Sequence, residues 1–330
     1  MKRYSIPLTD LEVSRLAFGC MNLASGGSSP ITEEERRAAI EVVVAAFEAG
    51  INLFDHADIY AHGKSEAVFA AVWQAIPREE IVLQSKCGII LPDYPRYSGP
   101  GRCDFSYDHI VAAVEGSLQR LQTDYLDILL LHRPDPLMEL EEVARAFDTL
   151  EHSGRVRYFG VSNFNAGQLE LLQAAVDQPL IVNQLELSLL HPHLIHEGII
   201  ANQIDGPHAL ATGILDFCRL TGVLVQAWSP VARGYLFNPP AGAPPNVRAA
   251  AEKVAALAAE KETTPEAIAL DWILRHPAGI QPIIGTTKPE RVRASALADE
   301  VTLTREEWYE LLIASRFPDA CAAPPGTRAL

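Results

Sequence analysis

The chain has 330 residues, of which 48% are hydrophobic and 21% are charged, and its formal net charge is −15 at pH 7. This composition is typical of a single globular protein with a large core, and the acidic balance disfavours a nucleic-acid partner, which needs a basic face. Five scattered cysteines form no Cys-x-x-Cys pair, no apolar run reaches the roughly 20 residues of a membrane span, and "MKRYSIPLTD" is no secretory leader, so we expect a cytoplasmic protein.

Eight short apolar or β-branched runs recur along the chain, and each is typical of a strand that is buried on both faces. They cover residues 15–20, 50–56, 80–87, 126–132, 156–163, 180–187, 223–229 and 280–285. Helical patterns separate them, and strands that alternate with helices predict a parallel α/β fold.

Several of the helical segments carry recognisable start and stop signals. The first spans 33–49, with Thr32 and Glu35 as a capping box and Gly50 as a stop signal. Two others cover 142–154 and the alanine-rich stretch 247–262. Three further helix starts are predicted from Thr263 with Glu266, Thr287 with Glu290, and Thr304 with Glu307.

The parallel strands could form either an open doubly wound sheet or a closed (β/α)₈ barrel. An open nucleotide-binding sheet usually carries Gly-x-Gly-x-x-Gly after its first strand, and "AFGCMNLASGG" lacks it. Polar residues follow nearly every strand instead, and a barrel gathers all strand ends around one mouth. We therefore predict a TIM barrel that forms a single domain over 1–330. Long loops at 90–107, 191–208 and 230–245 follow strands 3, 6 and 7, and the tail 317–330 is expected to be loosely ordered.

Four of these polar residues suggest acid–base chemistry. Asp55 and Lys86 end adjacent strands, which lie about 4.8 Å apart, so they can form a buried ion pair. His132 ends the next strand, and Tyr60 is close enough in the chain to fold back over the mouth. An ammonium beside a phenol favours the phenolate and is expected to lower the pKa of Tyr60. Such a phenol can deliver a proton to a substrate oxygen, which His132 would orient.

The other strand ends suggest a phosphate-bearing ligand with a flat ring. Basic and hydroxyl side chains surround a helix start after strand 8, where free N–H groups favour anions. Trp228 offers a flat face for a ring. Three residues could hydrogen-bond a carboxamide, namely Ser162, Asn163 and Gln184.

Taken together, the motifs resemble the aldo-keto reductases over residues 3–315. The similarity rests on "FDHADIY", "QSKCGI", "LLLHRPDP", "FGVSNF", "NQLELS", "AWSP" and "IIGTTKPERV", which occur in the family's order and spacing. It is most similar to a bacterial branch with "DHADIY" and "HRPDPLM" motifs. The resemblance implies an NADPH-dependent reduction of aldehydes or ketones to alcohols. It also implies a catalytic tetrad, in which Tyr60 is the general acid, Lys86 and Asp55 tune it, and His132 orients the carbonyl.

The same resemblance implies the residues that bind NADPH/NADP⁺. The nicotinamide would stack on Trp228, its carboxamide would meet Ser162, Asn163 and Gln184, and Thr286 and Arg291 match positions that bind the 2′-phosphate. The cofactor-binding set that we predict is Gly19, Cys20, Ser162, Asn163, Gln184, Trp228, Ser229, Pro230, Arg233, Gly234, Gly285, Thr286, Thr287, Lys288 and Arg291.

Four positions depart from the commoner family pattern. Gly285 stands where lysine is frequent, and Lys288 could compensate. His56 replaces a threonine, Ala61 a glycine and Arg133 a tryptophan. For His56 and Arg133, substrate contact and structural hydrogen bonding both remain open.

Other functions are considered beside reduction. Lys86 could act as a Schiff-base nucleophile in a lyase or aldolase, although pairing with Asp55 would keep it protonated. The chain could also be a non-catalytic subunit that senses NADPH. His191, His193 and His196 resemble metal ligands but lack a carboxylate partner, and we predict no metal. We expect a small carbonyl substrate, no membrane partner, and a monomer or weak homo-oligomer.

Overall fold

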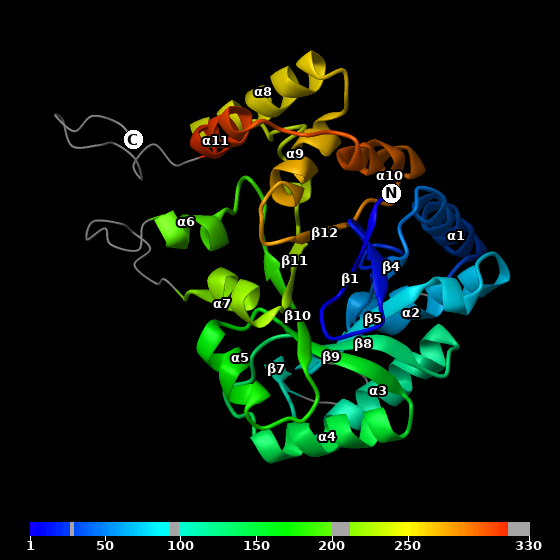
Figure 1. The fold of residues 1–330 in the computed structure, drawn as a ribbon. Coiled ribbons are helices and arrows are strands. Elements are labelled where there is room, and N and C mark those ends of the chain that lie inside the picture. Colours follow the sequence, from blue (N-terminus) through cyan, green and yellow to red (C-terminus); the bar gives the residue numbers. More distant parts are fainter. Residues whose placement is uncertain (27–29, 93–98, 200–211, 316–330) are drawn as a thin grey trace.

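The computed structural model describes residues 1–26, 30–92, 99–199 and 212–315. Within them, eight parallel strands close into a barrel, and helices surround it (Figure 1). The barrel strands are β3 (Ala17–Gly19), β4 (Leu53–Asp55), β5 (Val82–Cys87), β8 (Leu126–Leu131), β9 (Val156–Ser162), β10 (Leu180–Glu186), β11 (Leu224–Trp228) and β12 (Gln281–Ile284). The predicted barrel is therefore confirmed.

The helices alternate with these strands along the chain. They are α1 (Glu33–Glu48), α2 (Lys64–Phe69), α3 (Tyr107–Leu121), α4 (Leu140–His152), α5 (Ala166–Gln173), α6 (His193–Ile199), α7 (Ile214–Thr221), α8 (Pro245–Glu260), α9 (Pro265–Leu274), α10 (Pro289–Ala296) and α11 (Arg305–Ala314). Short 3₁₀ turns are η1 (Tyr60–Gly63), η2 (Ala70–Gln74), η3 (Arg78–Glu80), η4 (Ala232–Gly234) and η5 (Leu297–Asp299).

Two of the predicted helix starts are confirmed and two are wrong. Capping boxes begin α1 and α11, as predicted from Thr32 with Glu35 and from Thr304 with Glu307. The start of α9 is one residue later than predicted, because it is Thr264 whose hydroxyl accepts from the Ala267 amide and Pro265 that occupies the first helical position. At α10, Lys288 precedes Pro289 and the helix has no side-chain cap, so Thr287 with Glu290 was also misplaced.

Structure was missed at several places outside the barrel wall. The predicted loop 191–208 contains helix α6 from His193 to Ile199, and its residues 200–208 lie outside the described residues. An antiparallel hairpin of β1 (Arg3–Ser5) and β2 (Glu12–Ser14) precedes the barrel. Part of the predicted loop 90–107 also belongs to a hairpin, made by β6 (Ile89–Ile90) and β7 (Arg102–Cys103). The predicted tail 317–330 lies outside the described residues.

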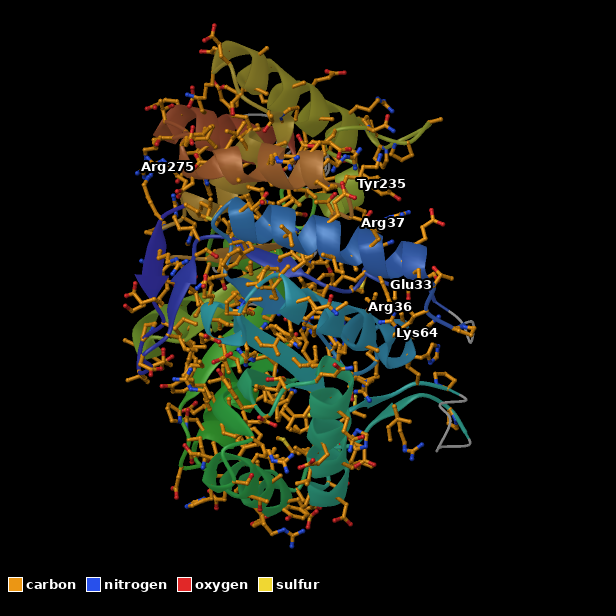
Figure 2. All side chains as sticks on the ribbon, turned by 90° about the vertical axis from the view of Figure 1, so that its right-hand side faces the viewer. Glu33, Arg36, Arg37, Lys64, Tyr235 and Arg275 are labelled. Atoms are coloured by element: carbon orange, nitrogen blue, oxygen red, sulfur yellow. The ribbon has the colours of Figure 1, made fainter. Side chains whose placement is uncertain are left out.

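Apolar side chains fill the lower half of the barrel, which is the half at the N-terminal ends of its strands. Alternate residues of the strands point inward, and there Leu53, Val82 and Leu224 meet Ile6 and Val13 of the first hairpin in one buried cluster. Figure 2 shows this hairpin at the left, with Lys64 and Tyr235 at the opposite end. Because the hairpin covers the lower end, the other end of the barrel is the open mouth. No helix of the described ranges is both long and apolar enough to cross a membrane.

Candidate active site

Asp55 and Lys86 form a buried ion pair at the mouth. The strands β4 and β5 are neighbours, and each side chain points inward, as alternate positions of a barrel strand do. Lys86 Nζ donates to Asp55 Oδ2 at 2.7 Å, and also to the carbonyl oxygen of His56 at 2.8 Å. Both residues are almost inaccessible to solvent. The predicted contact is therefore present.

Tyr60 reaches the same ammonium from the loop after β4. Its hydroxyl accepts the third hydrogen bond of Lys86 Nζ, at 3.1 Å. The turn that places it is strained, because Ala61 and His62 both have left-handed backbones, with φ of 48° and 57°. A left-handed residue with a side chain costs roughly 1–2 kcal/mol, which explains why glycine suits the position of Ala61.

Burial outweighs the ammonium in setting the pKa of Tyr60. Lys86 acts to lower that pKa, as expected, but burial of the phenol raises it more strongly, so the net shift is upward and the predicted lowering is wrong. The pKa of Lys86 is raised as well: burial lowers it, but the charges and hydrogen bonds of Asp55 and Tyr60 outweigh burial. At neutral pH the site therefore holds a protonated phenol beside an ammonium.

His132 lies next to this pair with a neutral ring. Its imidazole meets the ring of Tyr60 edge-on, with centroids 6.0 Å apart. Burial, and then the charges of Lys86 and Arg133, hold the pKa of His132 well below its usual 6.5. Its Nδ1 is buried without a hydrogen-bond partner among the described residues. A neutral imidazole carries one N–H, which can donate to a substrate oxygen.

The three predicted carboxamide ligands form one hydrogen-bonded network with Trp228, on or just after the strands β9, β10 and β11. Asn163 donates to Ser162 Oγ at 2.9 Å and to the carbonyl of His132 at 3.2 Å, and its own oxygen accepts from Trp228 Nε1 at 3.2 Å. Ser162 in turn donates to the backbone of Gln184 at 2.8 Å. Asn163 also has a left-handed backbone, with φ of 64°. The network holds the indole of Trp228 at the mouth, where it is partly exposed.

The remaining predicted ligands surround this cluster. Gly19 ends β3 and Cys20 follows it, and the amide of Cys20 donates to the Asp55 carbonyl at 2.8 Å. Ser229, Pro230, Arg233 and Gly234 lie in the turn after β11. Besides Gly234, two residues that carry side chains, Ser229 and Arg233, have left-handed backbones there, with φ of 55° and 56°. Strained residues at a mouth are typical of ligand sites.

The last group of predicted ligands lies between β12 and α10. Gly285, Thr286 and Thr287 link the two elements, and Thr286 Oγ1 accepts from the Lys288 amide at 3.2 Å. Lys288 immediately precedes α10 and Arg291 lies in its first turn, and both are exposed. Two long cationic side chains at a helix start without a side-chain cap favour binding of an anionic group.

The structure separates the two open cases, His56 and Arg133. His56 is completely buried below the mouth, and its ring packs edge-on against Phe69 with centroids 4.5 Å apart. Arg133 instead lines an open cavity of about 320 Å³. The cavity is lined by Arg133, Asn163, Leu185, Glu186, His191, His193, Leu194 and Trp228. His56 therefore lies away from this cavity, and its ring nitrogens make no hydrogen bond among the described residues, whereas Arg133 faces the space beside Trp228.

Two other features are separate from the tetrad. His191 and His193 meet edge-on at 4.4 Å in the wall of this cavity, and within the described residues no group of three side chains is arranged to hold a metal. A larger hollow of about 700 Å³ lies outside the barrel, between α1 and η2. Glu33, Arg36 and Arg37 of its lining are labelled on α1 in Figure 2. None of the predicted site residues lines it.

A polar layer inside the barrel was missed by the sequence reasoning. It consists of Gln84, Gln184, Gln226 and Gln281, which we call the glutamine layer, and only Gln184 was singled out from the sequence. A signal was available, because Gln84 precedes Lys86 by two residues and Gln226 precedes Trp228 by two. Residues two apart on a strand share a face, so these glutamines had to point into the barrel.

Comparisons with known proteins identify the family and the fold of the chain. The protein-family model described as "Aldo/keto reductase family" matches residues 15–315 of this sequence. The chain is 37% identical to the oxidoreductase YcsN of Bacillus subtilis, over 92% of this chain and 95% of that protein. It is 36% identical to a 6-dehydroglucose reductase of Agrobacterium fabrum, over 93% and 96%. Among solved structures, the glycerol dehydrogenase AKR11B4 of Gluconobacter oxydans has the same fold, with a TM-score of 0.79, 24% identity and 99% of each chain covered.

Proposed function

Because the chain belongs to the aldo/keto reductase family, we propose that it reduces an aldehyde or ketone to an alcohol with NADPH, with Tyr60 as the general acid. The observation that carries the proposal is the contact of 3.1 Å between Lys86 Nζ and the hydroxyl of Tyr60. A reductase must protonate the oxygen that gains electrons. The phenol is protonated at neutral pH, and it lies beside an ammonium that stays charged.

Each member of the tetrad has a distinct part in this reaction. When bound, the reduced nicotinamide supplies the hydride. Tyr60 gives its proton to the carbonyl oxygen, and the ammonium of Lys86 stabilises the phenolate that is left. Asp55 keeps Lys86 charged and in place. The neutral ring of His132 donates an N–H to the same carbonyl oxygen and orients it.

The residues around Trp228 fit a nicotinamide carboxamide. The indole is partly exposed beside the cavity and offers a face on which the ring stacks. Both N–H groups of the Gln184 side chain already donate, to Asp55 and to Gln226. Gln184 can therefore offer the carboxamide only its oxygen, which accepts from the carboxamide NH₂. Ser162 and Asn163 complete this group.

The choice of NADPH over NADH rests on the start of α10. Lys288 and Arg291 are exposed there, and Thr286 holds the turn that leads into the helix. Two cations and an uncapped helix start favour the 2′-phosphate that distinguishes NADPH. Gly285 leaves the position before Thr286 without a charge, so the discrimination depends on Lys288 and Arg291.

The cavity beside Trp228 favours a polar, hydroxylated carbonyl compound as the substrate. Arg133, Glu186 and His191 contribute hydrogen-bonding groups to its wall. A site built from such groups binds hydroxyl groups and rejects apolar analogues that leave them unpaired. A relative that is 36% identical is a 6-dehydroglucose reductase, which is consistent with a sugar-like aldehyde for this chain.

The alternative functions have less support. The raised pKa of Lys86 keeps its amine protonated, which disfavours attack on a carbonyl to form a Schiff base. A sensing subunit without turnover would have no need of a protonated phenol beside the ammonium. We further propose that the enzyme acts in the cytoplasm as a monomer or weak homo-oligomer.

Substitution of Tyr60 by phenylalanine tests the function. The variant should bind NADPH like the parent, because Tyr60 contributes only its hydroxyl to the reaction. Its kcat should fall by about a hundredfold or more on a panel of aldehydes and ketones. Binding is followed by quenching of tryptophan fluorescence, with Trp228→Phe as the control that separates Trp228 from the other three tryptophans. A Tyr60→Phe variant that turns over at the parent rate would refute the mechanism.

A further inference from the structure

The glutamine layer lies directly beneath the ion pair of the tetrad. Gln84, Gln184, Gln226 and Gln281 come from four strands, and all four are buried. The interior of a barrel is normally packed with branched apolar side chains, as it is in the lower half of this barrel. Buried amides are costly unless they are hydrogen-bonded, so a layer of four glutamines calls for a reason.

The hydrogen bonds within the layer are nearly complete. Gln84 Nε2 donates to Gln226 Oε1 at 2.8 Å, and Gln226 Nε2 returns a bond to Gln84 Oε1 at 3.1 Å. Gln226 Nε2 also donates to Gln281 Oε1 at 2.9 Å, and Gln281 donates to the Ser14 carbonyl at 2.7 Å. The reciprocal pair therefore fixes Gln84 in one orientation.

The layer meets the tetrad at a single atom, Asp55 Oδ1. Gln84 Nε2 donates to this oxygen at 2.5 Å and Gln184 Nε2 at 3.1 Å. The other oxygen, Oδ2, accepts from Lys86. Since each carboxylate oxygen has its own donors, the carboxylate cannot rotate without breaking bonds on both sides. The orientation of the Asp55 carboxylate then determines where the ammonium of Lys86 lies relative to the hydroxyl of Tyr60.

We propose that Gln84 is a positioning residue for proton transfer: it locks the Asp55 carboxylate, and through it Lys86, in the orientation that keeps Nζ on the Tyr60 hydroxyl. Gln226 contributes indirectly, because its reciprocal hydrogen bonds hold Gln84 in place. The inference rests on the proposed function, because it needs Tyr60 to be the proton donor. Gln184 contributes a second, longer bond, so Gln84 is the stronger test.

Gln84→Met tests the proposal, because methionine has a similar length and no donor. Its kcat should fall about tenfold or more while KM and NADPH affinity stay near the parent values. Asn183→Leu is the matched control: Asn183 is buried on β10 and donates to the Phe164 carbonyl, away from the tetrad. The control should lose thermal stability but keep its kcat.

Gln84→Glu adds a readout that a structural role would not move. A glutamic acid at this position can donate to Asp55 only while it is protonated, so its kcat should fall between about pH 6 and about pH 9, whereas Gln84→Met is low throughout. The groups that act on Tyr60 itself are Lys86, Asp55 and Cys20, and these are unchanged.

Two results would overturn the positioning role. One is a parent-like kcat and pH profile in both Gln84 variants. The other is an equal loss of kcat in Asn183→Leu, which would make the effect one of general stability. Either outcome is distinct from failure of the proposed function, because that failure requires Tyr60→Phe to remain active.

Discussion

The ammonium of Lys86 lies 3.1 Å from the phenolic oxygen of Tyr60, and the same nitrogen donates to Asp55 at 2.7 Å and to the His56 carbonyl at 2.8 Å. An ammonium has three N–H donors, and all three are used. Lys86 therefore cannot turn toward another acceptor without losing a bond. The geometry of the tetrad depends on this arrangement.

Lys86→Met should remove both activity and stability. Without the ammonium, Tyr60 loses the charge that stabilises its phenolate, and kcat should fall about a thousandfold. Asp55 is left as a buried carboxylate without its cation, which should cost about 3 kcal/mol of unfolding free energy. The double variant Asp55→Asn with Lys86→Met should regain most of that stability in denaturant titrations, yet stay inactive. Equal instability in the single and double variants would contradict this account.

Reduction and oxidation should respond differently to pH. The pKa of Tyr60 is raised, so the phenol remains a proton donor and the kcat of reduction should be flat from about pH 6 to about pH 9. Oxidation of the alcohol needs the phenolate, and its rate should rise across the same range. Rates in both directions at saturating substrate measure this. A reductive profile with a midpoint near neutral pH would assign the proton to another group.

His56 should make the protein sensitive to acid. Burial lowers its pKa from 6.5 to about 3, so the folded state cannot take the proton that the unfolded state binds below pH 6.5. The contribution of His56 to the free energy of unfolding is fully present above pH 6.5 and is lost as the pH falls toward about 3. Between pH 8 and pH 5 the loss is about 2 kcal/mol.

His56→Leu should remove this part of the pH dependence. Neither ring nitrogen of His56 has a hydrogen-bond partner among the described residues, so leucine breaks no side-chain hydrogen bond. Urea titrations at the two pH values compare the variant with the parent, and His152→Gln, a change at an exposed site on α4, serves as the control. If His56→Leu shows the parent's full pH dependence, burial of His56 is not its source.

Arg133→Met should change which substrates are used. The side chain lines the cavity beside Trp228, so its loss should raise KM about tenfold for a sugar-like aldehyde, since a hydrogen bond to a charged group is lost. KM for a small apolar aldehyde should change little. Arg133→Lys keeps the charge and should show a smaller effect on the first substrate. An equal rise for both aldehydes would place Arg133 outside the specificity site.

Arg291→Ala should weaken binding of NADPH but not of NADH. Loss of one charge-assisted contact to the 2′-phosphate should raise the Kd for NADPH about tenfold. Fluorescence titrations with both cofactors measure the ratio. Arg293 lies on the same helix and is exposed as well, so Arg293→Ala is the matched control. If both cofactors weaken together, Arg291 does not read the phosphate.

Much of the fold and of the central contact could be predicted from local patterns. Apolar runs separated by amphipathic segments predicted the barrel, because parallel strands are buried on both faces. Asp55 and Lys86 stand at the ends of consecutive strands, and consecutive strands in a barrel are neighbours, so their ion pair followed directly. The capping boxes of α1 and α11 were predictable for the same reason, since each depends on residues three apart.

Other features depended on opposing effects whose relative sizes cannot be judged from local sequence patterns. The hydroxyl that caps α9 belongs to Thr264 rather than to its neighbour Thr263, because Pro265 occupies the first helical position. The pKa of Tyr60 rises because burial outweighs the charge of Lys86, and the depth of burial is a property of the folded loop. The burial of the His56 ring against Phe69 is likewise a property of tertiary packing.

The alternation of strands and helices, and the side of each strand that faces inward, are properties of the amino-acid sequence alone. The hydrogen bonds that Gln84 and Gln226 exchange beneath Asp55 join residues 142 positions apart in the chain and exist only in the folded barrel. Side-chain direction along a strand repeats every two residues, so it follows from local sequence. Contact across the barrel interior depends on how the closed barrel sets its strands, which no local pattern contains.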